Sequence, residues 1–254
     1  MIAETTRLVP GGAARRDPAA TLRMRLYLGK RALVRGWLRL RARAIARKYR
    51  GYTMISRKRY RENLGLAALV ADRPGCVVEC GVWRGGMIAG LAEVLGARRT
   101  YYLFDSFEGL PPAQPLDGVK AKQYQENTTG HAYYDNCRAE MAFSDKAMRL
   151  AGARNVHFIK GWFNQTLPMQ APEEPIALLR LDGDWYDSTM VCLEALYEKV
   201  VPGGLIILDD YFYWEGCARA VHDFLSRRGI PDRIRQTPAG VCYLIRSEEP
   251  RSDA

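Results

Sequence analysis

Two apolar runs of the sequence each end in acidic residues that could hold a metal ion. Asp182 follows the run Leu178–Leu181, and Asp209 and Asp210 follow the run Leu205–Leu208. In open α/β sheets, ligands bind in the crevice at the carboxyl ends of the strands, so we expect the three acids to converge there. Three carboxylates that close repel one another, and a divalent cation is the simplest remedy. Ligands that are all oxygen favour Mg²⁺, Mn²⁺ or Ca²⁺ over zinc or copper.

Other roles for acids at these positions are open. An acid can instead cap the helix that follows its strand, which suits Asp187 before Ser188 better than it suits the Asp209–Asp210 pair. An EF-hand is excluded, because its loop requires Gly where Asp187 stands. The sequence Asp182-Gly-Asp184 is also a DxD pattern, with which metal-dependent glycosyltransferases hold a sugar diphosphate. A glycosyltransferase is therefore one alternative.

A glycine-rich turn and an acid after the next strand predict a nucleoside cofactor. Gly81 follows the run Cys76–Cys80 and permits a tight turn, and Gly85 lets a ligand approach the backbone ahead of a helix. The turn matches neither GxGxxG nor the phosphate-binding loop, which needs a Lys after its glycines. Asp105 follows the run Thr100–Phe104, at the place where a nucleotide ribose presents its hydroxyls.

Glu79 restricts the kind of cofactor. It lies beside the glycine turn, where a phosphate-bearing cofactor would meet repulsion and a cationic sulfonium with an amino-acid tail would not. A divalent cation nearby would lower the pKa of an alcohol that it ligates and so make the alcohol oxygen a better nucleophile. These residues together predict a nucleoside cofactor, compatible with a sulfonium, beside a divalent cation.

Strands and helices alternate after residue 75, which predicts an α/β fold with a largely parallel, doubly wound sheet covered on both faces. The seven predicted strands are Cys76–Cys80, Thr100–Phe104, Val156–Lys160, Ile176–Leu181, Leu205–Leu208, Arg233–Gln236 and Val241–Ile245. The predicted helices in this part are Gly86–Gly96, Tyr134–Gly152, Ser188–Val200 and Glu215–Arg228. Because only the turn Thr237–Gly240 separates the last two strands, the sheet should end in an antiparallel hairpin.

The chain length suits one principal domain with an added terminal element. Residues 1–20 show no periodicity and are expected to be a disordered lead-in. Residues 21–72 should form a helical extension, with an amphipathic helix from Thr21 to about Arg50 and a second helix that Ser56 caps and that ends near Ala71. The principal domain should span residues 73–248. Its polar stretch Pro111–His131 has no period and is expected to be a lid, near 111–131.

The charge of the chain is concentrated in one segment. Fifteen Lys and Arg and no Asp or Glu lie between Arg23 and Arg61, whereas the whole chain carries a net charge of +10. Such a stripe can follow phosphate backbones or anionic lipid, so a nucleic-acid or membrane-surface binding protein is a second alternative. A solvated helix face with partner contacts is the simpler interpretation, and the segment has few aromatic residues for base stacking.

Cysteine usage and hydropathy exclude further classes. The six cysteines show no paired metal-ligand spacing, so zinc is not expected. No window approaches the apolar length of a membrane span, and residues 1–16 lack the pattern of a secretory signal. We therefore expect a cytoplasmic protein without a transmembrane segment.

Taken together, these motifs resemble the TylF/MycF-type sugar O-methyltransferases, which methylate deoxysugar hydroxyls during antibiotic biosynthesis. The matching stretches are Gly51–Ser56, Val78–Gly86, Phe104–Pro111, Leu181–Ser188 and Pro202–Tyr211. The resemblance implies a Rossmann-like class I methyltransferase fold, S-adenosyl-L-methionine and Mg²⁺ as cofactors, and a sugar hydroxyl of a glycosylated natural product as acceptor. It assigns Mg²⁺ to the three acids and places these residues around the cofactor: Met54, Ser56, Glu79, Gly81, Gly85, Asp105, Ser106, Gly161, Trp162 and Asp182.

A more distant similarity, to catechol O-methyltransferase, bears on the catalytic base. That enzyme has a Lys three residues after its first metal acid, and here the position holds Trp185. Asp182, which could bind metal with one oxygen and accept a proton with the other, is therefore the base that the resemblance implies. His131 is a candidate contact to the acceptor, with a solvated loop histidine as an equal alternative. We expect a small-molecule glycoside partner, no nucleic acid, and a homo-oligomer, dimer or larger.

Overall fold

The computed structural model of the protein describes residues 40–131 and 133–247. The chain divides into two compact units, Met1–Arg41 and Ala42–Ala254, and only residues 40 and 41 of the first unit are described. The predicted lead-in, residues 1–20, and most of the predicted helix Thr21–Arg50 therefore lie outside the described residues. Residues 42–48 of the second unit are helical, in agreement with the end of that predicted helix.

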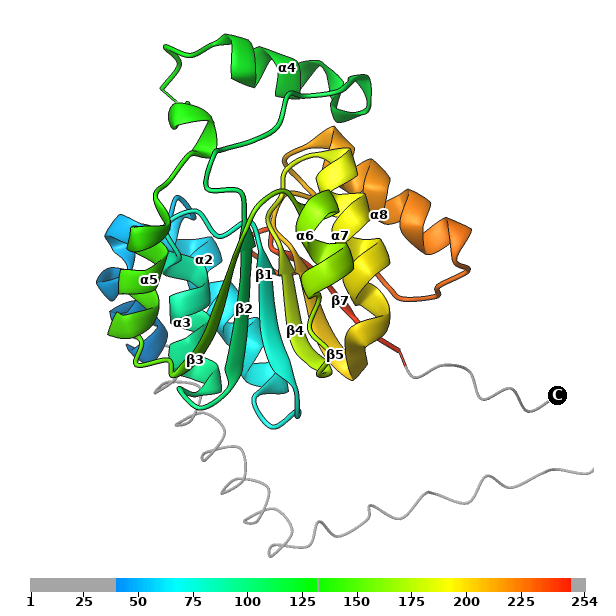
Figure 1. Cartoon of the computed structure of the whole chain (residues 1–254). Coiled ribbons are helices and arrows are strands. Elements are labelled where there is room, and N and C mark those ends of the chain that lie inside the picture. The colour runs from blue at the N-terminus through cyan, green and yellow to red at the C-terminus, as the bar shows by residue number, and fades with distance from the viewer. Residues whose placement is uncertain (1–39, 132, 248–254) are drawn as a thin grey trace, which may run out of the picture. The chain divides into compact units, whose positions relative to one another are not determined.

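A seven-stranded sheet forms the centre of the second unit, with the order β3-β2-β1-β4-β5-β7-β6 (Figure 1). The strands β1 to β5 run parallel, β7 is antiparallel to β5, and β6 is antiparallel to β7. The fold class and the terminal hairpin predicted from the sequence are confirmed. The strands are β1 (Cys76–Cys80), β2 (Thr100–Asp105), β3 (Asn155–Lys160), β4 (Ile176–Leu181), β5 (Val200–Leu208), β6 (Arg235–Gln236) and β7 (Cys242–Ile245).

Helices cover both faces of this sheet, as Figure 1 shows. On one face lie α2 (Arg57–Ala67), α3 (Gly86–Leu95) and α5 (Met141–Leu150), and on the other lie α6 (Phe163–Gln170), α7 (Tyr186–Leu196) and α8 (Glu215–Arg227). Each face has its own apolar cluster, and every residue of the central strands β1 and β4 is buried. A strand buried on both faces is mostly apolar, which explains the apolar runs in the sequence, and the two charged residues within these strands, Glu79 and Arg180, pair with each other. Short 3-10 helices occur at Arg50–Tyr52, Ala68–Val70, Pro115–Asp117, Asp135–Cys137 and Tyr197–Lys199.

Three segments differ from the sequence-based expectation. The stretch Pro111–His131, expected to be an irregular loop, contains a 3-10 turn and the helix α4 (Gly118–Glu126). Helix α6 was not expected, because Pro168 interrupts its pattern. The helix predicted for Tyr134–Gly152 begins only at Met141, since Asp135, Asn136 and Cys137 all have positive φ. Strong local turns therefore override the helical periodicity at this place.

The predicted cap of the second helix is present, because the side chain of Ser56 accepts a hydrogen bond from the backbone N–H of Arg59 at 3.4 Å. Helix α2 then packs closely against α3. The hydroxyl of Tyr60 donates to the carbonyl of Gly86 at 2.7 Å, and a Cβ at Gly90 would overlap that hydroxyl. Among the described residues, no helix has the length and apolar character that a membrane crossing requires.

This packing predicts opposite effects for two helical glycines. Gly90→Ala should lower the free energy of unfolding by about 1–3 kcal/mol, because the methyl group meets Tyr60 in a close-packed contact. The matched control is Gly65→Ala in α2, where nothing lies within 4 Å of the added Cβ. That variant should be more stable by up to about 1 kcal/mol, since Ala is the better helix former. Urea unfolding measures both, and a stabilising Gly90→Ala would contradict the described α2–α3 contact.

Candidate active site

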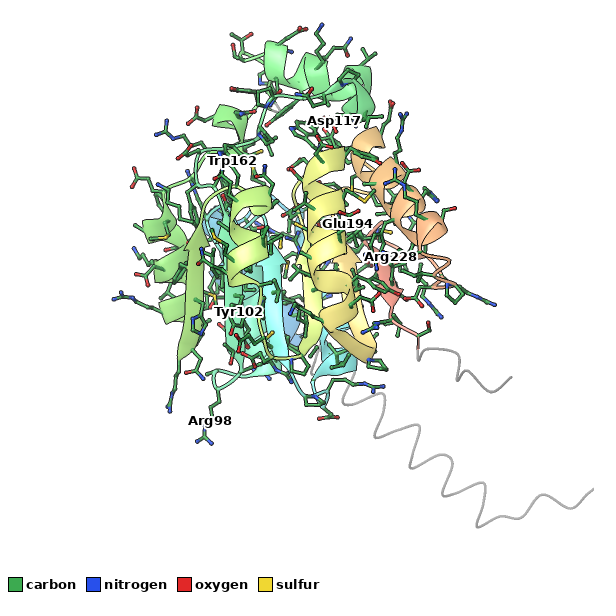
Figure 2. The ribbon with its side chains drawn as sticks, turned by 45° about the vertical axis from the view of Figure 1, so that its right-hand side comes forward. Arg98, Tyr102, Asp117, Trp162, Glu194 and Arg228 are labelled. Atoms are coloured by element: carbon green, nitrogen blue, oxygen red, sulfur yellow. The ribbon has the colours of Figure 1, made fainter. Side chains whose placement is uncertain are left out.

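A large cavity, of about 960 Å³, lies at the carboxyl ends of the parallel strands. Figure 2 shows Trp162 and Asp117 at this end of the sheet and Arg98 at the opposite end. The cavity brings together nine of the ten residues that the resemblance placed around the cofactor: Met54, Ser56, Glu79, Gly81, Asp105, Ser106, Gly161, Trp162 and Asp182. Asp209 and Asp210 line the same cavity, so predicted cofactor and metal residues share one space.

Gly85 and His131 are not among the lining residues. Gly85 has φ 77°, and a Cβ there would lie 2.7 Å from the Cα and Cβ of Ser144 on α5. Close packing of α5 and a left-handed turn therefore explain this glycine, in place of the predicted approach of a ligand. His131 is exposed at the far end of the segment after α4, and its contact with an acceptor remains a prediction.

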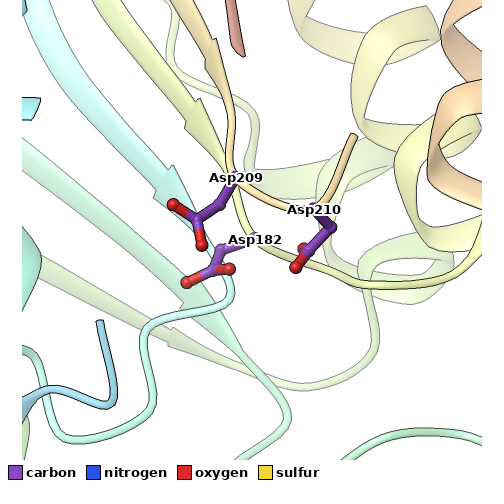
Figure 3. A group of neighbouring side chains, drawn as sticks. All are labelled: Asp182, Asp209 and Asp210. Atoms are coloured by element: carbon purple, nitrogen blue, oxygen red, sulfur yellow. The ribbon is translucent and has the colours of Figure 1, made fainter. Parts of the chain in front are cut away.

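The three acids Asp182, Asp209 and Asp210 do converge (Figure 3), with one carboxylate oxygen of each lying within 4.8 Å of the others. Asp182 follows β4 and the other two follow β5, so the parallel pairing of these strands places them side by side. The turn after β1 fits directly against Asp182, because a Cβ at Gly81 would overlap its carbonyl oxygen. A glycine is therefore required where the presumed cofactor turn meets the acid-bearing loop.

A buried arginine lies beneath the acids. Arg180, on β4, has a guanidinium that is 1% exposed, and its Nη1 donates to Glu79 Oε1 at 2.8 Å and to Asp182 Oδ2 at 2.7 Å. Its Nη2 lies 2.8 Å from Asp209 Oδ1, although this pair lacks hydrogen-bond alignment. From α2, Arg59 donates to the carbonyl of Asp209 at 2.5 Å. Two cations thus orient acids at the carboxyl ends of three neighbouring strands.

The acids nevertheless carry more negative charge than the two arginines neutralise. Burial raises the pKa of Glu79 to about 8 and that of Asp182 to about 6, although Arg180 opposes both rises. Burial also raises the pKa values of Asp184 and Asp210 well above their usual range, and neighbouring carboxylates add to the effect. A site of this kind binds protons or cations.

The donor set suits a divalent cation of the Mg²⁺ type. All of the converging groups are carboxylates, which hard cations prefer. Asp209 Oδ1 lies 2.8 Å from Arg180 Nη2 without hydrogen-bond alignment, so this ion pair leaves lone pairs on the oxygen that could ligate an ion. Asp182, Asp209 and Asp210 would hold such an ion.

The carboxylate of Asp105, predicted to accept hydrogen bonds from a ribose, already accepts three hydrogen bonds from the backbone. Its Oδ2 accepts the backbone N–H groups of Val82 at 2.6 Å and Trp83 at 2.8 Å, and its Oδ1 accepts that of Phe107 at 2.7 Å. In contrast, two other polar atoms at the cavity are buried without a partner among the residues described, namely Glu79 Oε2 and Trp83 Nε1. Such atoms are available to the polar groups of a ligand.

One wall of the cavity overlaps the stretch Pro111–His131, whose individual lining residues sequence reasoning did not name. The segment between β2 and α5, residues 106–140, is called the cap segment here, and it contributes Leu110, Pro111, Pro112, Gln114, Asp117, Tyr124, Tyr134 and Cys137. Tyr213 and Trp214 line the cavity from the loop after β5. The signal for this aromatic wall was the run Tyr211–Trp214, four aromatic residues that directly follow Asp210.

Polar contacts attach the cap segment to the loops that carry the acids. The buried carboxylate of Asp117 accepts the backbone N–H of Tyr186, the first residue of α7, at 2.7 Å. Trp185 Nε1 donates to the carbonyl of Pro111 at 2.8 Å, and Lys120 Nζ donates to the carbonyl of Tyr213 at 2.8 Å. The cap segment is therefore a fixed wall over the acids in this structure.

Asp184 connects this wall to the three acids. It has φ 59°, an unfavourable value for a residue other than glycine, and its backbone N–H donates to Asp210 Oδ2 at 3.1 Å. Its Oδ1 accepts the indole N–H of Trp214 at 2.6 Å. Backbone strain of this kind persists where the surroundings fix it, often at functional sites.

Comparison with known proteins identifies relatives of the whole domain. A match to the TylF family, described as macrocin O-methyltransferase, covers residues 29–244. Mycinamicin III 3''-O-methyltransferase of Micromonospora griseorubida is 35% identical over 210 residues, which are 77% of this chain and 79% of that protein. A tetracenomycin-C 4'-O-methyltransferase of Streptomyces olivaceus, which acts on a dimethoxy-rhamnosyl compound by its name, is 36% identical over 198 residues, 73% of this chain and 72% of that protein. The solved structure of the O-methyltransferase NovP has a TM-score of 0.65 and 32% identity, and the alignment covers 78% of this chain and 83% of that one.

The raised pKa values predict how stability depends on pH without divalent cations. Glu79 and Asp182 bind protons more tightly when folded than when unfolded, where their pKa values are near 4.5 and 3.8. Their contribution to stability is therefore complete below about pH 4 and is lost as the pH rises through about 6 and 8. In EDTA, the free energy of unfolding should fall between pH 5 and pH 8.5.

Glu79→Gln is the matched variant for this experiment. It removes the group with the higher pKa, so its stability should fall less steeply than that of the wild type above pH 7. Parallel curves for the two proteins would show that Glu79 is already ionised in the folded protein, contrary to the effect of burial.

Proposed function

We propose that this chain, which belongs to the TylF macrocin O-methyltransferase family, transfers a methyl group from S-adenosylmethionine to a sugar hydroxyl of a glycosylated natural product. In this proposal Asp182, Asp209 and Asp210 hold Mg²⁺. The protein is a SAM-dependent O-methyltransferase with the class I fold. The finer proposal concerns the acceptor and the metal. Relatives named for mycinamicin and tetracenomycin support a glycoside acceptor.

The observation that carries the metal proposal is the convergence of the three acids at one cavity. Their oxygens lie within 4.8 Å of one another, and Glu79 of the presumed cofactor side shares Arg180 with Asp182. A hydroxyl placed against the acids would thus be close to a cofactor placed against Glu79. This proximity favours in-line transfer, because two reactants held in one geometry react as an intramolecular pair.

The cofactors supply a methyl group on a sulfonium and, through Mg²⁺, a lowered pKa for the acceptor hydroxyl. The protein residues orient and enclose these partners. Arg180 fixes one oxygen of Asp182 and leaves the other facing the cavity. The cap segment, with Trp185 and Trp214 buried beneath α4, covers the cavity beside the acids. Exclusion of water strengthens the electrostatic interactions inside.

Asp182 is the proposed base. With a pKa raised to about 6, its carboxylate is largely ionised near neutral pH and can accept the proton of the acceptor hydroxyl. Its Oδ2 accepts a hydrogen bond from Arg180, and the other acceptor positions of the carboxylate would serve the metal and the hydroxyl proton. Asp184 lies two residues after Asp182 and also lines the cavity, so it is the residue to compare with Asp182 as a candidate base.

The aromatic wall suits a sugar ring carried on an apolar scaffold. Tyr124, Tyr134, Tyr213 and Trp214 all line the cavity, and Trp214 packs edge-on against Trp185 and Tyr124 at centroid distances of 5.0 and 5.5 Å. Aromatic faces provide apolar contact area with fixed geometry, and the acids beside them accept hydrogen bonds from hydroxyls. This combination fits a glycoside better than it fits a charged acceptor.

The glycosyltransferase alternative finds no support in the site. Such an enzyme must hold a diphosphate, but both guanidinium groups at the cavity, Arg59 and Arg180, are already bound to acids. Asp184, the second acid of the DxD pattern, accepts a hydrogen bond from Trp214.

For the same protein we propose a cytoplasmic location and assembly into a dimer or a larger homo-oligomer. Light scattering of the purified chain tests the assembly.

Metal removal tests the proposed mechanism. EDTA should abolish methyl transfer and Mg²⁺ should restore it, because the acceptor loses both its pKa shift and its orientation. Asp209→Asn keeps an oxygen ligand but removes a charge, so excess Mg²⁺ should recover part of its activity. Asp182→Asn also removes the proposed base, so excess Mg²⁺ should not rescue it.

Binding of S-adenosylhomocysteine, measured by calorimetry, is the control, and both variants should retain it. Full activity in EDTA would contradict the metal proposal. Rescue of Asp182→Asn by Mg²⁺ would keep the metal and move the base to another residue, and loss of activity in Asp184→Asn would then identify that residue.

A further inference from the structure

The carboxylate of Asp105 joins two turns that border the cavity. The turn after β1 supplies the N–H groups of Val82 and Trp83, and the turn after β2 supplies that of Phe107. All three donor–acceptor distances are between 2.6 and 2.8 Å, the range of charge-assisted bonds. The carboxylate is the common acceptor of all three groups and so connects the two turns.

Two of the three donors belong to residues in the left-handed region. Trp83 has φ 48° and Phe107 has φ 56°, and both are bulky side chains for which this region is rare. Each such residue is destabilising by itself and persists only where its surroundings hold it. The bonds to Asp105 are the contacts that hold both backbones.

The held residues shape the cavity itself. Trp83 lines it, and its ring packs edge-on against Tyr134 of the cap segment with centroids 6.4 Å apart. A shift of the Trp83 backbone would move this ring and its unpartnered indole N–H. The position of Asp105 is therefore transmitted to a wall that a ligand contacts.

The same bonds limit what else Asp105 can bind. An ionised carboxylate offers about four acceptor positions, and three are used by backbone N–H groups. The vicinal hydroxyls of a ribose present two donors. Both could not be accepted without giving up a backbone bond.

We propose that Asp105 is a positioning residue that holds the turns at Trp83 and Phe107 in left-handed conformations and so builds the cofactor cavity, and that it is not the paired acceptor of the two ribose hydroxyls. The proposal rests on the proposed binding of a SAM-type cofactor. It changes the role that the sequence predicted for Asp105 and keeps the residue at the cofactor site.

The test compares two ligands by calorimetry: S-adenosylhomocysteine and its 2′,3′-dideoxy analogue, which has no ribose hydroxyls to donate. Asp105→Asn keeps the shape of the side chain but turns one acceptor into a donor that faces backbone N–H groups. It should weaken both ligands at least tenfold and by the same factor within about twofold. A loss for S-adenosylhomocysteine that exceeds the loss for the analogue by fivefold or more would overturn the proposal.

A second variant separates positioning from general loss of structure. Glycine adopts positive φ without strain, so in a Phe107→Gly background the turn depends less on Asp105. The loss of affinity that Asp105→Asn causes should then be at least threefold smaller than in the wild-type background. Equal losses in both backgrounds would contradict the positioning role of Asp105. Phe107 is buried and does not line the cavity, so the comparison does not remove a ligand contact.

Two measurements keep this result distinct from a failure of the proposed function. The same cycle of variants is followed by urea unfolding without any ligand, where Asp105→Asn and Phe107→Gly should be non-additive. Additive effects on the free energy of unfolding would overturn the positioning role of Asp105 even if the wild type bound no cofactor. Asp145→Asn, which removes an exposed acid paired with Arg149 on α5, is the control and should leave both ligand affinities unchanged.

Discussion

The buried guanidinium of Arg180 is the interaction on which the arrangement of the site depends. Parallel pairing of β1, β4 and β5 brings Glu79, Asp182 and Asp209 to one end of the sheet, and Arg180 contacts all three from within β4. Charges taken out of water are tolerated only when they are paired, and removal of one partner typically costs 3–5 kcal/mol. The acids therefore keep fixed orientations, in which each has an oxygen directed toward Arg180 and another available to the cavity.

From this ion cluster, contacts extend to the rest of the cavity. Glu79 connects the ion cluster to the side of the cavity where we propose that the cofactor binds. There Asp105 holds the turn after β1 against the turn after β2. On the other side, Asp184 joins Asp210 to Trp214, against which the cap segment packs. The turn after β1, the acids and the aromatic wall are thus parts of one connected structure. A change at any one of them should be felt at the others through direct contacts and not through distant coupling.

The sequence predicted the sheet well because the buried strands are predominantly apolar. Strands β1 and β4 were predicted with correct ends, and the acids that follow β4 and β5 do meet. Helices α4 and α6 were missed because tertiary contacts, such as Ala121 beneath Trp185, stabilise segments with weak periodicity of their own. Gly85 was assigned to a ligand although it accommodates Ser144, because a glycine in sequence does not show which neighbour requires it. Arg180 was overlooked within an apolar run, yet a charge in a central strand implies a buried partner. That signal was available in the sequence.

The central claim is that the three acids, held by Arg180, ligate a divalent cation beside the methyl donor. The most direct measurement is a crystal structure of the enzyme with S-adenosylhomocysteine and Mn²⁺, recorded where manganese scatters anomalously. The account predicts one anomalous peak bonded at about 2 Å to an oxygen of each of Asp182, Asp209 and Asp210, with Arg180 still contacting Glu79. A structure in which manganese is absent from this position, while the cofactor is bound at the cavity, would contradict it.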